Sequence, residues 1–280
     1  MPTVSEKRAT FHELHKSGCF VIPNPWDVPS ARWLQGMGFK ALASTSAGFA
    51  WSKCLPDNAV TRDMVLEHLR ELVENTDLPI NADFEGGFAH DPADVAENVG
   101  LAVDTGVAGL SIEDSKRDRE NPVYTLEEGV ARIRAARAAI DKKGGDTLLV
   151  GRAENFLVGR ADLDDTIARL KAYSNAGADC LFAPGISKPE QIKAIVQAVA
   201  PKPVSLLIGT PIGLTLKDAE ALGVRRVSIG GSLARAAWGG FLRAAKQIAE
   251  EGRFDAFADA APGMEINKFF YKDNKARSGA

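Results

Sequence analysis

An amphipathic run of helix length, a glycine and a short apolar run follow one another repeatedly along this chain, and this repeat constrains the fold more than any other feature. The glycines of four such repeats are Gly38, Gly106, Gly177 and Gly223. A glycine just past a helix can adopt the left-handed backbone conformation that ends it, and a short apolar run after it is typical of a buried strand. The repeat therefore predicts successive βα units and a parallel sheet.

Eight apolar runs of strand length can be counted, separated for the most part by segments of helix length. The predicted strands are Cys19–Pro23, Ala41–Thr45, Leu78–Asp83, Gly109–Glu113, Thr147–Arg152, Cys180–Pro184, Val204–Gly209 and Arg225–Gly230. The clearest predicted helices are Thr61–Asn75, Asp91–Thr105, Leu126–Lys142, Leu163–Asn175 and Lys188–Ala198. Eight units favour a closed (β/α)8 barrel, the TIM barrel of the α/β class, over the alternative of an open, doubly wound sheet.

The length of the chain suits one such barrel with additional helices at its ends. It has 280 residues, and a barrel of this type typically needs about 250. We expect an N-terminal helix and a barrel domain over residues 1–250, then a helical extension over residues 251–280. Aromatic residues of the extension, such as Phe254 and Tyr271, are expected to pack on the barrel or on another subunit. The last residues, 274–280, are expected to be disordered.

Composition argues against several other classes of protein. The net charge is −3, without the basic excess of a nucleic-acid-binding protein. No apolar run approaches the ~18 residues of a membrane span, and Met1–Gly18 lacks the apolar core of a signal peptide. Cys19, Cys54 and Cys180 are too widely spaced for a disulfide framework or a CxxC metal site. We therefore expect a cytoplasmic protein that binds neither nucleic acid nor membrane.

Carboxylates follow three consecutive predicted strands. They are Asp83 and Glu85 after the third strand, Glu113 and Asp114 after the fourth, and Glu154 after the fifth. In a (β/α)8 barrel the C-terminal ends of the strands build the active site. Carboxylates that converge there repel one another, so Arg152 or a divalent cation must compensate their charge. Ligation by oxygen alone favours Mg²⁺ or Mn²⁺ over zinc.

Simpler interpretations of single residues remain open. A lone acidic residue after a strand, such as Asp83 or Asp114, is commonly the N-cap of the next helix. The glycines at Gly209-Thr210 and Gly230-Gly231-Ser232 could form a phosphate cradle, but a glycine-rich helix start serves packing equally well. It is the cluster of carboxylates with Arg152, rather than any one member, that predicts a functional site.

The order of these motifs resembles the isocitrate lyase and phosphoenolpyruvate mutase superfamily, in particular its 2-methylisocitrate lyase-like and oxaloacetate decarboxylase-like branch. The resemblance covers roughly Phe11 to Ala249. It is carried by Pro25–Arg32, Gly38–Leu42, Ser44–Ser46 in a substrate loop, Leu55–Asp57, Asn81–Asp83, Ser111–Asp114 and Gly151–Glu154. Each segment is short, but their order and spacing together are specific.

The resemblance implies a metal and a substrate. It implies Mg²⁺ held largely through water by Asp57, Asp83, Glu85 and Glu113. It implies that Thr45, Ser46 and Ala47 bind a small 2-oxo acid, whose carboxylate and oxo oxygen chelate the metal. Arg152 would pair with a carboxylate, and Arg152 and Glu113 are the catalytic candidates. A cation and an arginine stabilise the enolate that forms when a bond beside a carbonyl breaks.

Two segments depart from the family pattern. Asn81 stands where many members have the first Asp of Asp-Ala-Asp, which leaves the individual metal ligands open. The isocitrate and methylisocitrate lyases carry a loop with an acid/base Cys and a His, whereas Asp114–Val123 contains neither. Isocitrate lyase activity itself is therefore not expected. The stretch is highly charged and predicts either a gating lid or a solvated surface loop.

The predicted function is a Mg²⁺-dependent carbon–carbon lyase acting on a small 2-oxo or 2-hydroxy di- or tricarboxylate, of the oxaloacetate decarboxylase or methylisocitrate lyase type. One alternative is carbon–phosphorus chemistry on phosphonopyruvate, by mutase or hydrolase. Another is a barrel that binds a metabolite without turnover. The resemblance also implies a homo-oligomer, a dimer or tetramer, in which the region Ala234–Phe270 contacts a neighbouring subunit.

Overall fold

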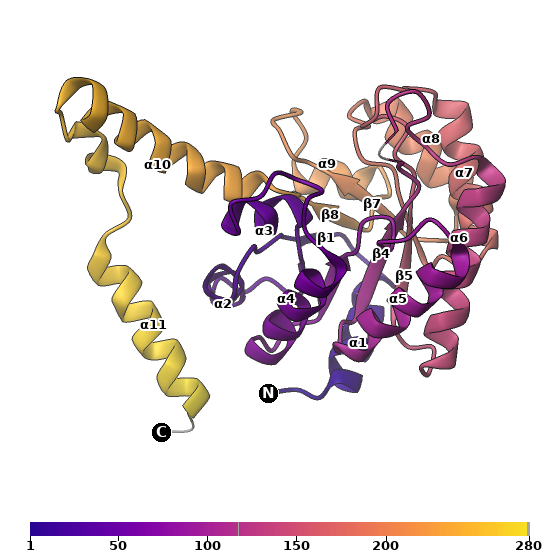
Figure 1. Cartoon of the computed structure of the whole chain (residues 1–280), viewed down its shortest axis with the longest axis horizontal. Helices are drawn as coiled ribbons and strands as arrows, with labels where there is room; N and C mark the ends of the chain where they lie inside the picture. Colours follow the sequence, from indigo (N-terminus) through magenta and orange to yellow (C-terminus); the bar gives the residue numbers. More distant parts are fainter. Residues whose placement is uncertain (117, 279–280) are drawn as a thin grey trace. The chain divides into compact units, whose positions relative to one another are not determined.

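Eight parallel strands form the centre of the molecule. The computed structural model describes residues 1–116 and 118–278. Its strands are β1 (Phe20–Ile22), β2 (Leu42–Ala43), β3 (Ile80–Asp83), β4 (Gly109–Glu113), β5 (Leu148–Arg152), β6 (Cys180–Phe182), β7 (Val204–Leu207) and β8 (Arg226–Ser228). From β2 to β8 each strand pairs with the next along the chain, and β8 pairs with β1. The Ala43 amide donates to the Pro23 carbonyl over 3.0 Å and bridges the remaining gap between β1 and β2. The predicted (β/α)8 barrel is confirmed (Figure 1).

Helices surround these strands and extend the chain at both ends. They are α1 (Val4–Leu14), α2 (Val28–Gly36), α3 (Ser46–Ser52), α4 (Arg62–Asn75), α5 (Pro92–Asp104), α6 (Leu126–Lys142), α7 (Leu163–Asn175), α8 (Pro189–Val199), α9 (Leu216–Ala221), α10 (Ser232–Glu251), the 3₁₀ helix η1 (Asp255–Asp259) and α11 (Gly263–Ser278). The predicted helices Leu126–Lys142 and Leu163–Asn175 are confirmed as α6 and α7. Helix α3 was not predicted. It begins in the expected substrate loop because the Thr45 hydroxyl caps it, accepting the Gly48 amide at 3.3 Å.

The repeated glycines lie where the sequence predicts them. Gly38, Gly106, Gly177 and Gly223 have φ angles of +90°, +88°, +109° and +88°. At Gly177 a Cβ atom would also lie 2.5 Å from Cγ of Arg137, so a larger residue would clash as well as strain the backbone. These glycines end one helix and direct the chain into the next strand, which sets the spacing of the βα units.

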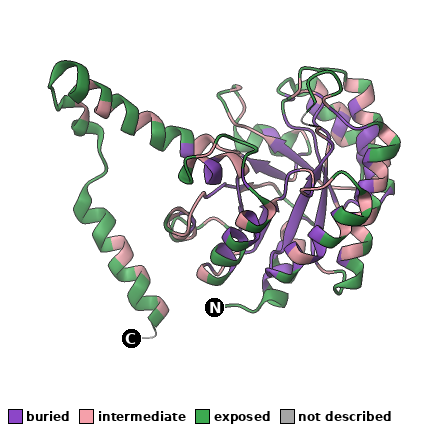
Figure 2. Cartoon of the chain, in the orientation of Figure 1, coloured by how far each residue is buried: buried purple, intermediate pink, exposed green. Residues whose placement is uncertain are grey.

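Small and apolar residues fill the interior of the barrel. Phe11, from α1, packs with Ala43, Leu148 and Phe182 in one buried cluster. Gly109 makes room for it, since a Cβ atom there would lie 2.7 Å from Cε1 of Phe11. The strands are buried, whereas the surrounding helices bury one face and expose the other (Figure 2). This packing fixes the strands whose C-terminal ends carry the candidate site.

The C-terminal part of the chain forms a unit of its own. Internal contacts divide the structure into Met1–Gly231 and Ser232–Ala280. Helix α10 thus belongs to the second unit, whereas the sequence-based boundary after residue 250 falls just before its last residue, Glu251. Only Ala234 is buried in α10, and no described residue is buried in α11. Disorder was expected from residue 274, but α11 continues to Ser278; residues 279–280 lie outside the described part.

Two expectations about composition can be compared with the structure. Cys19, Cys54 and Cys180 are free thiols. Among the described residues, no helix combines the length and the apolar content that crossing a bilayer requires.

Candidate active site

A cavity of 180 Å³, here called the central cavity, lies at the C-terminal ends of the strands. Its lining includes six of the residues predicted from the sequence, namely Thr45, Ser46, Ala47, Asp57, Asp83 and Arg152. The other two, Glu85 and Glu113, line a second cavity of 210 Å³, here called the side cavity. The predicted site residues are therefore divided between two cavities, and Arg152 connects them through its ion pairs.

Arg152 is shared by three carboxylates. Its Nη1 lies 3.3 Å from Oδ1 of Asp83 and 3.2 Å from Oε2 of Glu113, and its Nε lies 2.5 Å from Oε1 of Glu154. The barrel sets this proximity, because Arg152 in β5 is in register with Glu113 in β4. Burial by itself lowers the pKa of Arg152, but Glu154, Glu113 and Asp83 together hold it above its usual range. Arg152 therefore stays charged and compensates the charge of the acidic cluster. The sequence predicted that either Arg152 or a divalent cation would do so.

Burial changes the acidity of the carboxylates around Arg152. It raises the pKa of Glu154 to about 7, although the adjacent Arg152 opposes the change. Burial likewise raises the pKa of Glu113, with Arg152 opposing it and Asp83 adding to it. Glu154 therefore has a pKa suited to holding or releasing a proton near neutral pH. The sequence named Glu154 only as a member of the cluster.

Asp57 and Asp83 form the acidic wall of the central cavity. The Ser46 amide donates to Oδ2 of Asp83 at 3.0 Å, and the Asp83 amide donates to the Ser44 hydroxyl at 2.9 Å. These bonds join the end of β3 to the start of α3. Burial raises the pKa of Asp57, and the nearby Asp83 raises it further. The Ser46 amide, expected to bind substrate, is thus engaged by Asp83 in this structure.

The donor chemistry of these carboxylates fits a hard divalent cation, since every predicted ligand atom is an oxygen. Their arrangement fits less well. In the described part of the chain, no group of three or more His, Cys, Asp or Glu side chains is placed to hold a metal ion. Asp57 and Asp83 lie on one cavity and Glu85 and Glu113 on the other. The sequence-based expectation is a cation held largely through water by all four residues, which the direct ligand geometry does not test, so this ligand set stays a prediction.

The floor of the central cavity contains a pair that the sequence did not predict as a site. Oδ1 of Asn81 accepts a hydrogen bond from Nη1 of Arg226 at 3.1 Å, and both residues line the cavity. Asn81 lies two residues before Asp83, on the same side of β3, and points into the barrel interior. It therefore faces Arg226 rather than the rim carboxylates. An arginine within the predicted buried strand Arg225–Gly230 was the signal that could have indicated Arg226.

Comparison with known proteins now identifies the family. The family model named phosphoenolpyruvate phosphomutase matches residues 11–249. The chain belongs to this family. The resemblance inferred from the sequence motifs is thereby confirmed.

Three similar proteins illustrate the match. An uncharacterised protein of Mycobacterium tuberculosis is 32% identical over 225 residues, which cover 79% of this chain and 81% of that protein. Oxaloacetate decarboxylase of Paraburkholderia xenovorans is 29% identical over 234 residues, covering 81% of this chain and 75% of the enzyme. A solved structure from Burkholderia cenocepacia J2315, provisionally described as a lyase or mutase, is 47% identical, with a TM-score of 0.93 over 96% of this chain and 97% of that chain.

Asp114 of this phosphomutase-family chain does not join the acidic cluster. Its Oδ2 accepts hydrogen bonds from the Tyr173 hydroxyl at 2.6 Å and from Nη1 of Arg169 at 3.0 Å. Its Oδ1 accepts the Glu154 amide at 2.8 Å. The carboxylate thus joins the ends of β4 and β5 to α7. The sequence placed Asp114 on the rim with the others, but it is turned toward α7 and holds the scaffold together.

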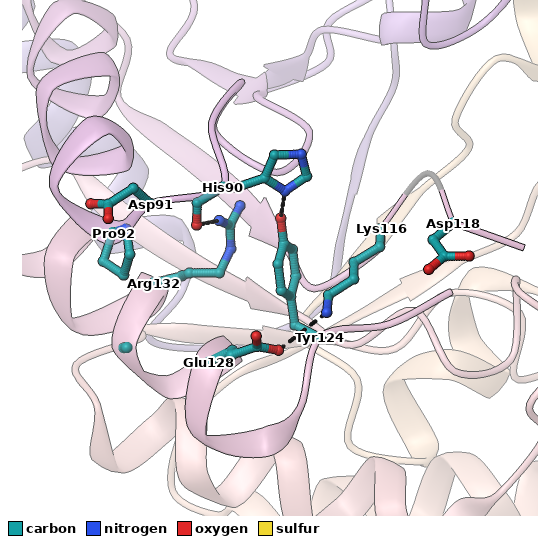
Figure 3. Close-up of a pocket in the computed structure, with 9 residues that line it drawn as sticks. His90, Asp91, Pro92, Lys116, Asp118, Tyr124, Glu128 and Arg132 are labelled. Atoms are coloured by element: carbon teal, nitrogen blue, oxygen red, sulfur yellow. Dashed lines mark hydrogen bonds and ion pairs between the residues drawn. The ribbon is translucent and has the colours of Figure 1, made fainter. Parts of the chain in front are cut away.

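The charged stretch after β4 forms part of a different cavity. A bridge between Ser115 and Val123 closes the stretch at its base; Arg117 lies outside the described residues. The neighbouring outer cavity, of 780 Å³, lies against the starts of α5 and α6 (Figure 3). In it, Nδ1 of His90 lies 2.5 Å from the Tyr124 hydroxyl, and Nζ of Lys116 lies 3.3 Å from Oε2 of Glu128. The ion pair of Lys116 with Glu128 holds the start of the stretch against α6, and whether the stretch acts as a lid stays a prediction.

Of the two glycine-rich segments that could form a phosphate cradle, the one that begins at Gly230 lies at the central cavity. Gly230 and Gly231 line the central cavity. A Cβ atom at Gly231 would lie 3.3 Å from the ring of Trp51. Close packing against this ring accounts for the glycine, which agrees with the simpler of the two interpretations.

Proposed function

We propose that this protein is a lyase that uses a divalent cation, Mg²⁺ or Mn²⁺, to cleave a carbon–carbon bond beside the carbonyl of a small 2-oxo or 2-hydroxy di- or tricarboxylate. The observation that carries the proposal is the position of Arg152. It is a largely buried, charged arginine, with 17% of its side chain exposed, that lines the central cavity and is held by three carboxylates at the mouth of a phosphomutase-family barrel. The name of the 29% identical oxaloacetate decarboxylase supports the carbon–carbon lyase over other chemistries.

Arg152 suits the charge that develops in such a reaction. Cleavage beside a carbonyl leaves its electron pair as an enolate, with negative charge on the former carbonyl oxygen. Arg152 can donate to that oxygen or to the adjacent carboxylate through a planar fork of N–H groups. A bound divalent cation, held by Asp57 and Asp83 with Glu85 and Glu113, would supply Lewis-acid stabilisation of the same oxygen. Thr45, Ser46 and Ala47, which line the same cavity, would orient the acid.

Glu154 and Glu113 supply the proton chemistry in this proposal. The enolate carbon must take up a proton after cleavage, and a 2-hydroxy acid must lose one before it. Glu154 has a pKa near 7 and touches Arg152, so it can hold that proton at working pH without leaving the cluster. Glu113 lies on the side cavity and contacts the same arginine. The roles of both residues are thus linked to the charge of Arg152.

The test is a product assay on the purified protein with Mg²⁺, repeated with EDTA. Pyruvate would be followed from oxaloacetate and from 2-methylisocitrate, and pyruvate and phosphate from phosphonopyruvate. Cation-dependent pyruvate from either carbon acid supports the lyase. Phosphate from phosphonopyruvate would instead establish a hydrolase, and rearrangement to phosphoenolpyruvate, followed by ³¹P NMR, would establish a mutase. The name of the family model, phosphoenolpyruvate phosphomutase, supports this carbon–phosphorus alternative.

A barrel that binds a metabolite without turnover is the remaining outcome. It would show as calorimetric binding of oxalate in the presence of Mg²⁺, with no product from any of the three acids. The absence, among the described residues, of a group arranged to hold a metal keeps this outcome in the test.

We also propose that the chain forms a homo-oligomer through its C-terminal unit. Trp238, Phe241 and Phe254 are 43%, 60% and 61% exposed, which is unusual for aromatic side chains placed so close in sequence. A subunit contact over them would bury this surface. Light scattering that gives the mass of one chain, 29.9 kDa, would contradict it.

A further inference from the structure

Arg226 occupies an unusual position for a charged residue. It lies in β8 in register with Phe20 and Ser205, and its accessible surface is only 3% of the full value. Its side chain nonetheless lines the central cavity, together with Asn81 and Ser111. It is thus a buried arginine at the floor of the same cavity that contains Arg152 near its mouth.

Nothing in the described part of the chain neutralises Arg226. An arginine has five N–H donors and stays protonated in proteins. Of these, Nη1 donates to Oδ1 of Asn81 at 3.1 Å, whereas Nε is buried without a hydrogen-bond partner among the described residues. The ion pairs of the described residues include none with Arg226. A buried charge without a counter-ion is costly, so this side chain is prepared for an anion from outside the chain.

Titratable groups near Arg226 do not supply the missing negative charge. Burial raises the pKa of Cys180, so its thiol stays neutral even though Arg226 opposes the change. Burial and the charge of Arg226 lower the pKa of His15 to about 3, so this imidazole is neutral as well. Asp83, a carboxylate of the cavity wall, is engaged by Arg152 and the Ser46 amide.

We infer that Arg226 binds a second acidic group of the substrate, a carboxylate, so that the central cavity takes a molecule with an acidic group at each end. One end lies at Arg152 and the acidic wall, and the other lies on the floor. That one acidic group of the substrate binds at Arg152 rests on the proposed function. Asn81 fits this role because its amide oxygen orients the guanidinium without neutralising it, whereas an aspartate there would provide a permanent internal counter-ion.

A substrate carboxylate bound to Arg226 favours one type of carbon–carbon cleavage over another. A carboxylate that leaves as CO₂ loses its charge in the transition state, so an arginine bound to it stabilises the ground state and slows the step. In aldol-type cleavage of a 2-hydroxy acid, a base removes the hydroxyl proton and the hydroxyl carbon becomes a carbonyl. The electron pair of the broken bond passes to the other fragment, which takes up a proton and keeps all its carboxylates. A carboxylate on Arg226 therefore favours a substrate whose second acidic group is retained in a product.

The test compares equilibrium binding of three 2-hydroxy acids that share one end, measured by calorimetry with Mg²⁺ present. Lactate has no second acidic group, malate has a carboxylate, and 2-hydroxy-3-phosphonopropionate has a phosphonate. We expect the wild-type protein to bind malate at least about 10-fold more tightly than lactate. Arg226→Gln should reduce this ratio to about one, because it removes the charge and leaves lactate binding unchanged. A preference for the phosphonate over malate that depends on Arg226 would overturn the carboxylate assignment.

Asn81→Asp is the second variant, in case Arg226→Gln does not fold. It keeps Arg226 and supplies an internal carboxylate, so it should also remove the preference for malate. An unchanged ratio of malate to lactate affinity in either folded variant would overturn the inference and leave the proposed function standing.

Malonate separates the floor site from the proposed chemistry, since it has two carboxylates and no 2-hydroxy group. Thermal stabilisation by malonate that is present in the wild-type protein and absent in Arg226→Gln would support the floor site even if lactate and malate both failed to bind. That failure would count against the proposed function alone. Equal malonate stabilisation of both proteins, or none of either, would overturn the floor site.

Discussion

Arg152 and Arg226 line the same cavity in opposite surroundings. Arg152 lies within 3.3 Å of carboxylate oxygens on three residues, whereas the hydrogen bond from Arg226 goes to a neutral amide oxygen at 3.1 Å. Arg152 holds three carboxylates together, whereas the positive charge of Arg226 has no counter-ion among the described residues. The difference teaches that the surroundings of an arginine decide its part in a cavity: Arg152 is held among carboxylates next to the proposed chemistry, whereas Arg226 keeps its charge for the proposed ligand.

The largest effect is expected from Arg152→Met. Without the guanidinium, the buried Glu113 and Glu154 and the partly buried Asp83 lose their shared counter-ion and the enolate loses its donor, so we expect kcat to fall by about 10³-fold or more. The melting temperature should fall too, since breaking a buried ion pair costs roughly 3–5 kcal/mol. Arg152→Lys is the matched control, because it keeps the charge but not the fork. It should recover much of the stability and little of kcat, as measured by pyruvate release and thermal unfolding. A methionine variant with normal kcat would remove Arg152 from the chemistry.

The next effect concerns the pH dependence of stability and depends on Glu154. Its pKa is about 7 in the folded protein against a usual 4.5, so between these values the folded state holds a proton that the unfolded state does not. The free energy of unfolding should therefore fall as pH rises from 4.5 to 7, by on the order of 3 kcal/mol from this group. In the Glu154→Gln variant this contribution to the fall in the free energy of unfolding should be absent. Urea unfolding of both proteins across this range measures it, and parallel curves would contradict a raised pKa.

Two smaller effects on stability, opposite in sign to each other, are expected from two substitutions of Asn81. Asn81→Asp gives Arg226 a counter-ion at the position of an existing hydrogen bond, so the protein should become more stable by about 1–3 kcal/mol. Asn81→Ala removes the acceptor and leaves the charge, so it should be less stable and still gain stability from malonate. Differential scanning calorimetry with and without malonate distinguishes the two variants. If both shifted the melting temperature in the same direction, the contrast between the two arginines would lose its basis.

The fold could be predicted almost completely from the sequence. β4, α6 and α7 have the predicted ends, and the four glycines that end helices have positive φ. These features depend on local signals, which are apolar periodicity, helix caps and glycine. The helical end of the chain is an exception. Its last residues, 274–280, were expected to be disordered because chain ends are commonly poorly ordered, but α11 continues to Ser278.

The site could be predicted only in part. The sequence placed Asp83, Glu113 and Arg152 at adjacent strand ends, and the barrel brings them together. It did not predict the contact between Asn81 and Arg226, which lie 145 positions apart in the chain. Nor did it show that Asp114 turns away from the rim. Both depend on which way a side chain points and on which distant residue it meets, and neither follows from periodicity along one segment.

The smallest effect is expected from a substitution beside a third arginine, Arg169, which lines neither the central nor the side cavity. Arg169 pairs with Asp114 at 3.0 Å, and the Tyr173 hydroxyl donates to the same oxygen at 2.6 Å. Tyr173→Phe removes one of two donors and leaves Arg169 in place. It should lower stability by about 1 kcal/mol, or roughly 2–4 °C in melting temperature, with kcat and malate affinity unchanged. A fall in kcat out of proportion to this change would mean that the link from Asp114 to the Glu154 amide positions the Arg152 cluster. The scaffold arginine and the site arginine would then act as one network.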